Sequence, residues 1–276
     1  MRYIPIIFIL ILINGCYQID QPIEVENSIK IKSESKELQD SIVAKVFRSE
    51  ILKTEGVFST EWQEELNRAL EKDSTIAYLW QQKAMPLFKQ RKYELGMPFL
   101  DKAVKYDERQ YLEYRGFMKC IFAKRYKESI LDFEEALKKY GNSYVMDHSY
   151  TFYIALNKIQ LNQFKEAKAL LETEIERQKK AQGEDWVHHL DLFYLGISRY
   201  EQNEYEGAIK AFDKALKLYP EFSDAQMYKA ICLRKLGQTD EATSLRKIAQ
   251  KNGKDGYTIN EDNAIYEQYP YQIRWN

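Results

Sequence analysis

The segment 124–140, KRYKESILDFEEALKKY, indicates a repeated structure, because its pattern returns at 203–220 as NEYEGAIKAFDKALKLYP. In each copy an aromatic residue is followed by a small residue three positions later, then by phenylalanine and alanine. The matching positions are Tyr126, Ser129, Phe133 and Ala136 in the first copy and Tyr205, Ala208, Phe212 and Ala215 in the second. Residues at this spacing share one face of a helix. The pattern therefore predicts repeated amphipathic helices that pack large side chains over small ones.

Further copies of the pattern surround these two. They contain Tyr93, Gly96, Leu100 and Ala103; Phe164, Ala167 and Leu171; Leu192, Leu195 and Gly196 before Tyr205, with Pro220 after it; and Ser223, Ala230, Gly237, Ala242 and Ala249. The spacing resembles that of the tetratricopeptide repeat. The resemblance implies an all-α, right-handed superhelical solenoid of antiparallel helix pairs over residues 74–252. Residues 36–73, with Trp62, Leu66, Ala69 and Leu70, are predicted to form a degenerate repeat that caps its N-terminal end.

The spacing of the repeats is irregular. The aromatic landmarks Tyr93, Tyr126, Phe164 and Tyr205 are separated by 33, 38 and 41 residues, whereas a tetratricopeptide repeat has about 34. We place the extra residues near 140–149 and 174–189, where we expect longer helices or loops.

The N-terminus has the form of a secretory signal. After Met1-Arg2, an apolar run ends at Ile13; as a helix it would span about 16 Å, too short to cross a bilayer. The sequence Ile13-Asn14-Gly15-Cys16 resembles the lipobox of bacterial lipoproteins. The resemblance implies a signal peptide over 1–15 and a lipid on Cys16, which would anchor the chain to the cell envelope, with the outer membrane favoured by Tyr17. The alternatives are a plain signal anchor and an ordinary signal with a chance cysteine. Residues 16–35 are predicted to be a flexible tether.

Composition and spacing give no sign of catalysis. With 41 basic and 42 acidic side chains the formal charge is −1, and no basic block suggests nucleic acid as a partner. The histidines are His148, His188 and His189. Because His188 and His189 are adjacent, they point to different sides of a helix, and no Cys/His spacing typical of zinc occurs. We therefore expect no enzymatic activity, no bound cofactor and no bound metal ion. Cys120 and Cys232 are predicted to be small buried thiols.

A partner groove is predicted from the family resemblance. Tetratricopeptide repeat proteins commonly hold partners along a concave face lined by the first helix of each pair. The corresponding residues here are Tyr78, Gln81, Met85 and Phe88; Glu113, Phe117 and, with a one-residue offset, Cys120; Phe152 and Leu156; Phe193, Ile197 and Tyr200; and Met227, Ile231 and Arg234. Such an apolar, aromatic groove suits an amphipathic helix or an extended apolar peptide.

The predicted function is thus a membrane-anchored, non-catalytic adaptor whose partner is an unknown protein or peptide. Two alternative interpretations remain. Aromatic rings also stack on sugars, so a glycan-binding or small-ligand-binding lipoprotein is the alternative function. Any single groove residue could instead pack between neighbouring helices.

Residues 253–276 are predicted to form an extended tail. The segment GYTINEDNAIYEQYPYQIRWN (256–276) loses the helical period and carries Tyr257, Tyr266, Tyr269, Tyr271 and Trp275, many aromatic residues for a disordered end. It could fold back to cover the last repeat or enter the groove, bind another protein, or be disordered. The first alternative hides apolar surface, as the end of a solenoid requires.

Overall fold

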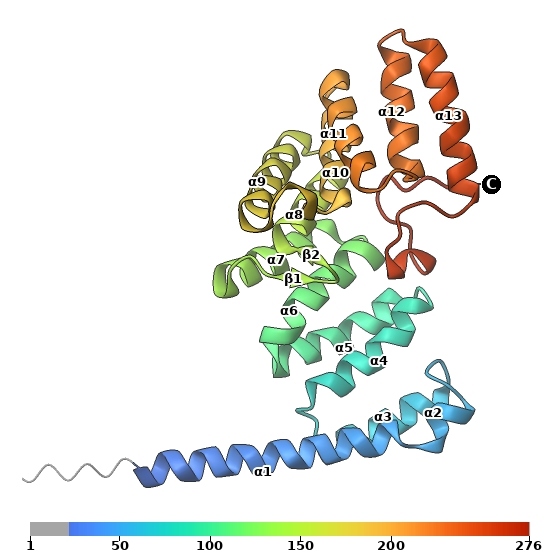
Figure 1. Ribbon diagram of the computed structural model, residues 1–276. Coiled ribbons are helices and arrows are strands. Elements are labelled where there is room, and N and C mark those ends of the chain that lie inside the picture. The colour runs from blue at the N-terminus through green and yellow to red at the C-terminus, as the bar shows by residue number, and fades with distance from the viewer. Residues whose placement is uncertain (1–21, 276) are drawn as a thin grey trace, which may run out of the picture. The chain divides into compact units, whose positions relative to one another are not determined.

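The computed structural model describes residues 22–275, so the predicted signal peptide and Cys16 lie outside the described residues. The chain divides into two compact units, residues 1–49 and 50–276. In the first unit, helix α1 covers Pro22–Phe47 (Figure 1).

Helix α1 corrects the prediction of a flexible tether, which is wrong for residues 22–35. The helix begins at a proline, whose fixed φ suits a first helical turn, and the residues that follow include several glutamates and lysines, which favour helix. Its apolar residues do not gather into one stripe, and for this reason the sequence showed no helical period there.

The second unit is an array of antiparallel helix pairs, as predicted (Figure 1). It begins with α2 (Glu50–Thr54) and α3 (Thr60–Lys72), which buries Trp62, Leu66, Ala69 and Leu70. Over the described residues five hairpins follow, and each packs on the next. They are α4 (Ala77–Lys89) with α5 (Tyr93–Tyr106), α6 (Glu108–Phe117) with α7 (Tyr126–Tyr140), α8 (Tyr150–Gln160) with α9 (Phe164–Gln182), α10 (His189–Tyr200) with α11 (Tyr205–Leu218), and α12 (Ser223–Lys235) with α13 (Thr239–Lys254).

The five hairpins share one turn. The residue two positions before each second helix has a positive φ, between 55° and 81°: Arg91, Lys124, Asn162, Asn203 and Gly237. Glycine and asparagine tolerate this left-handed conformation best. The recurrence of the turn shows that the same structural unit is repeated even where the sequence has arginine or lysine.

Small residues let the two helices of a hairpin approach closely. A Cβ atom on Gly196 of α10 would lie 2.4 Å from the Phe212 ring of α11, and one on Gly116 of α6 would lie 3.1 Å from Phe133 of α7. The small-then-large pattern of the sequence is therefore a packing rule, with phenylalanine filling the space over a missing side chain.

The irregular repeat spacing is absorbed in three places. The residues near 140–149 form a β-hairpin of two short strands, β1 (Tyr144–Val145) and β2 (His148–Ser149). Those near 174–189 lengthen α9 and form the 3-10 turn η2 (Glu184–Trp186). A π-helical turn, η1 (Met118–Phe122), follows α6 and accounts for the one-residue offset at Cys120.

Candidate functional site

The C-terminal tail, residues 255–275, leaves α13 and folds back along the array (Figure 1). One carboxylate holds it at two points: the backbone N–H of Ile259 donates to Asp224 Oδ2 at 3.1 Å, and that of Ile273 to Asp224 Oδ1 at 2.6 Å. Asp224, on α12, is fully buried. Burial raises the pKa of Asp224 to about 6, although the two hydrogen bonds lower it. The Asp224 carboxylate thus joins the two ends of the segment between Ile259 and Ile273, and we call this pair of hydrogen bonds the Asp224 clamp.

The middle of the tail is embedded against α10. The Tyr194 hydroxyl donates to the carbonyl of Pro270 at 2.9 Å, and the Tyr271 hydroxyl donates to Glu201 Oε1 at 2.8 Å. Tyr269 is only 2% exposed. Burial raises the pKa of Tyr194 well above its usual value, so its hydroxyl stays protonated and able to donate. This part of the tail is integral to the fold.

The far end of the tail reaches the first hairpins. Lys124 Nζ donates to the carbonyl of Gln268 at 2.9 Å, and Arg91 Nε lies 3.4 Å from Glu267 Oε1. The 3-10 turn η3 (Asp262–Ile265) precedes this contact. Since Glu261 also contacts His148 beside α8, the tail touches all five hairpins.

The structure places the five predicted tail aromatics differently from one another. Tyr269 is buried, Tyr266 and Tyr271 are half-buried, and Tyr257 is exposed. Trp275 lies against α13, where a Cβ atom on Gly253 would be 2.2 Å from its ring. Of the three alternatives for the tail, this arrangement corresponds to the fold-back.

The predicted groove residues separate into two groups. A buried group, 0–1% exposed, consists of Phe88, Phe117, Cys120, Phe152, Leu156, Phe193 and Ile197. These side chains are mainly core, a correction to their prediction as an open lining, although Phe117 also borders the cleft described below. A second group keeps exposed surface and consists of Tyr78, Gln81, Met85, Glu113, Tyr200, Met227, Ile231 and Arg234. Of these, Met227, Ile231 and Arg234 line a hollow with α13 rather than with the tail.

A cleft of about 490 Å³ remains open between the first hairpins and the tail. Its lining is apolar and rich in methionine, with charge at Lys89 and Asp262. It consists of Gln81, Met85, Lys89, Tyr114, Phe117, Met118, Phe122, Met146, Asp262, Asn263, Ile265 and Tyr266. Ile265 is 79% exposed and Met146 is 41% exposed, so apolar surface faces solvent at its rim.

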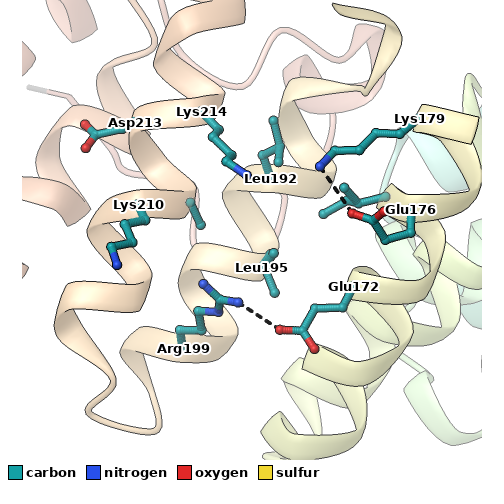
Figure 2. A pocket seen from close by; sticks show the side chains of 11 residues that line it. Glu172, Glu176, Lys179, Leu192, Leu195, Arg199, Lys210, Asp213 and Lys214 are labelled. Atoms are coloured by element: carbon teal, nitrogen blue, oxygen red, sulfur yellow. Dashed lines mark hydrogen bonds and ion pairs between the residues drawn. The ribbon is translucent and has the colours of Figure 1, made fainter. Parts of the chain in front are cut away.

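A larger hollow of about 570 Å³ lies between α9, α10 and α11 (Figure 2). Its apolar floor includes Leu192 and Leu195, and two ion pairs lie in its wall: Arg199 Nη2 is 2.8 Å from Glu172 Oε1, and Lys179 Nζ is 3.2 Å from Glu176 Oε1. Lys210 and Lys214 line it as well, so most of its lining residues are charged. The cleft therefore suits an apolar segment better than this hollow does.

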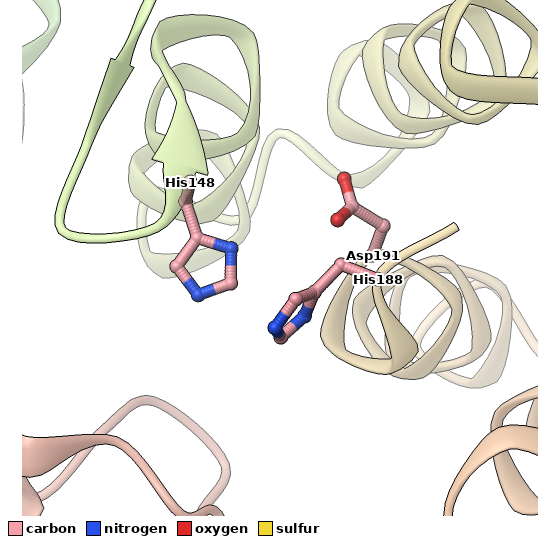
Figure 3. A group of neighbouring side chains, drawn as sticks. All are labelled: His148, His188 and Asp191. Carbon is pink, nitrogen blue, oxygen red and sulfur yellow. The ribbon is translucent and has the colours of Figure 1, made fainter. Parts of the chain in front are cut away.

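Among the residues that the structure describes, one cluster could hold a metal ion. His148 of β2, His188 at the start of α10 and Asp191 in its first turn converge (Figure 3). One candidate ligand atom from each side chain lies within 4.8 Å of the others. Sequence reasoning missed the cluster because His148 and His188 lie in the two insertions, whose spatial relation no helical period reveals.

Among the described residues, no helix combines the length and apolar character needed to cross a membrane.

Comparisons with known proteins agree with the fold. A tetratricopeptide repeat family model matches residues 194–255, and no curated protein sequence matches the chain. The solved structure of PilW, described as a widely conserved type IV pilus biogenesis factor, is similar with a TM-score of 0.59 at 15% identity, covering 83% of this chain and 98% of PilW. MamA from Desulfovibrio magneticus RS-1 gives a TM-score of 0.54 at 15% identity, covering 65% of this chain and 96% of MamA. The chain therefore has the fold of tetratricopeptide repeat proteins, and its last repeats match the sequence of that family.

Proposed function

We propose that the chain is a non-catalytic protein-interaction scaffold, and that the cleft between the first hairpins and the tail binds an apolar segment of a protein partner. The observation that carries the proposal is the lining of this cleft: Met85, Met118 and Met146 stand beside aromatic residues in an open, mostly apolar site. Methionine side chains are flexible and polarizable, and they adapt to partner surfaces of irregular shape.

The composition of the cleft supports a peptide over the alternative of a glycan. Sugar recognition would need polar groups placed around an aromatic platform, whereas the polar side chains here, such as Gln81 and Asn263, stand among methionines and phenylalanines. An apolar peptide would bury the exposed side chains of Ile265 and Met146.

We further propose that the scaffold is anchored to a bacterial envelope membrane, with the outer membrane favoured, by a lipid on Cys16. The support is the lipobox-like sequence Ile13-Asn14-Gly15-Cys16. Replacing Cys16 by serine should abolish labelling by a clickable fatty acid and release the protein from the membrane fraction. Unchanged labelling and fractionation would remove the anchor from the proposal.

The binding proposal is tested by photo-crosslinking in cell envelopes. A photoreactive phenylalanine analogue at Ile265 should give a specific protein adduct, which Met146→Asp should reduce at least fivefold by placing a charge at the rim of the cleft. The matched control is the same analogue at Leu131 on α7, a leucine that is 64% exposed and outside the cleft.

A protein adduct at both positions, or one that Met146→Asp leaves unchanged, would contradict binding in the cleft. An adduct to a carbohydrate in place of a protein would favour the glycan alternative.

A further inference from the structure

The histidine–aspartate cluster is built from the parts of the chain that depart from the repeat. His148 lies in the β-hairpin inserted before α8, and His188 follows the extended α9 and η2. Together they bring nitrogen and oxygen atoms, from the segment before α8 and from the start of α10, within 4.8 Å of one another (Figure 3).

Two atoms of this cluster are buried without a hydrogen-bond partner in the described part of the chain. They are Nδ1 of His148 and Oδ1 of Asp191, on side chains that are each 1% exposed. A buried polar atom that makes no hydrogen bond destabilises a protein by about 1–3 kcal/mol. Two such atoms directed into one small space indicate that something bridges them.

The surrounding contacts prepare the His148 imidazole to act as a ligand. His148 Nε2 lies 3.2 Å from Glu261 Oε1 of the tail, and since a carboxylate accepts, Nε2 donates and the neutral ring has its lone pair on Nδ1. A carboxylate behind a histidine is the arrangement that orients many metal-bound imidazoles. His188 Nδ1 accepts the backbone N–H of Leu190 at 3.2 Å, so a metal ion at this nitrogen takes the place of that hydrogen bond.

The types of ligand atom in the cluster suit a transition metal ion. A neutral imidazole is the form that binds metal. Three ligands from two nitrogens and one carboxylate suit zinc, whereas calcium and magnesium prefer oxygen alone.

We propose that His148, His188 and Asp191 form a binding site for a divalent transition metal ion, with zinc the best match. The present separations, up to 4.8 Å, exceed the roughly 3.4 Å between ligands around tetrahedral zinc, so binding draws the three side chains together. A metal here would join the third hairpin to the fourth and, through Glu261, fix the tail against both. The inference is independent of any partner in the cleft.

The competing explanation is a buried water molecule that bridges the same atoms. The two are separated by titrating the full-length, chelator-treated protein with zinc chloride against a chromophoric chelator. We expect one zinc ion per chain and a loss of affinity of at least 100-fold in His148→Ala. Glu261→Gln removes no ligand and should weaken binding 10- to 100-fold. The matched control is His189→Ala, the neighbouring histidine outside the cluster.

A second measurement guards against a variant that merely misfolds. Asp191→Cys substitutes a thiolate, and with cobalt(II) it should produce a sulfur-to-metal charge-transfer band that the wild-type protein lacks. Cys120 and Cys232 do not contribute, because burial raises the pKa of both thiols to about 12. Failure of the wild-type protein to take up zinc, or wild-type affinity in a folded His148→Ala variant, would overturn the proposal.

Discussion

Replacing Asp224 by alanine should release the C-terminal tail from the array. The substitution leaves two backbone N–H groups, those of Ile259 and Ile273, without their acceptor, at about 1–3 kcal/mol each. Part of this loss is offset, because the substitution also removes a charge whose burial is unfavourable. We therefore expect a net loss of about 1–3 kcal/mol in tail docking.

Amide hydrogen exchange measures this directly. A loss of 1–3 kcal/mol corresponds to a fall in protection of roughly 5- to 150-fold at the two isoleucine amides. The control is Asp213→Ala on α11, whose exposed carboxylate pairs with Lys229 Nζ at 2.7 Å and should contribute at most about 1 kcal/mol. If both amides keep their protection in folded Asp224→Ala, the tail is held by other contacts and the clamp reasoning is refuted.

The same residue predicts a pH dependence. Because the folded-state pKa of Asp224 lies above the ordinary value of 3.8, the native state binds this proton more tightly than the unfolded state. Its contribution to the free energy of unfolding therefore falls as pH rises from about 4 to about 6. Asp191 has a similarly raised pKa, so the test is the difference between wild-type and Asp224→Ala denaturation curves across this range.

Two further substitutions test the packing of the hairpins. Gly196→Ala should lower the free energy of unfolding by about 1–3 kcal/mol, because the added methyl would lie 2.4 Å from the Phe212 ring. The control is Gly207→Ala, which should be neutral or stabilising because its methyl meets only the flexible side chain of Arg199. Equal urea midpoints for the two variants would contradict this packing argument. Asp132→Asn should cost about 3–5 kcal/mol, because it removes the carboxylate that lies 2.8 Å from the buried Lys119 and 2.7 Å from the half-buried Arg115. A melting temperature unchanged from wild type would show that these ion pairs are dispensable.

The repeat was predictable because its cause is local. Large and small residues at helical spacing determine which faces of neighbouring helices meet. The structure packs the large residues over the small ones as the spacing predicts, for example Phe212 over Gly196. Helix α1 was not predictable in the same way, because a helix without an apolar stripe leaves no periodic signal.

The predicted groove residues and the residues that the tail contacts occupy different positions on the same helices. Phe152 and Phe193 fill the core, whereas the tyrosine after each of them lies 11 residues before the next helix, a position that Tyr228 shares. Of these tyrosines, Tyr194 donates to the tail and the ring of Tyr228 contacts it. A phenyl ring has no polar group to satisfy, but a phenol can reach a backbone carbonyl. The recurring tyrosine was therefore the available signal for the tail-facing surface.

The histidine–aspartate cluster and the contact of Asp224 with the tail could not be predicted from the sequence. Each joins segments separated by 35 residues or more, through loops whose path depends on the folded array. Only packing of the hairpins fixes those distances.

The tail contacts also bear on how the chain folds in time. A hairpin forms between residues close in sequence, but the contact of Arg91 with Tyr266 spans 175 residues and that of Lys124 with Gln268 spans 144. Such distant contacts form late, after nearby ones have shortened the loop to be closed. We therefore expect the array to assemble first and the tail to dock last. Until the tail docks, Tyr194 and Tyr228 lack their contacts with it, and we expect aggregation to compete with folding most strongly in that interval.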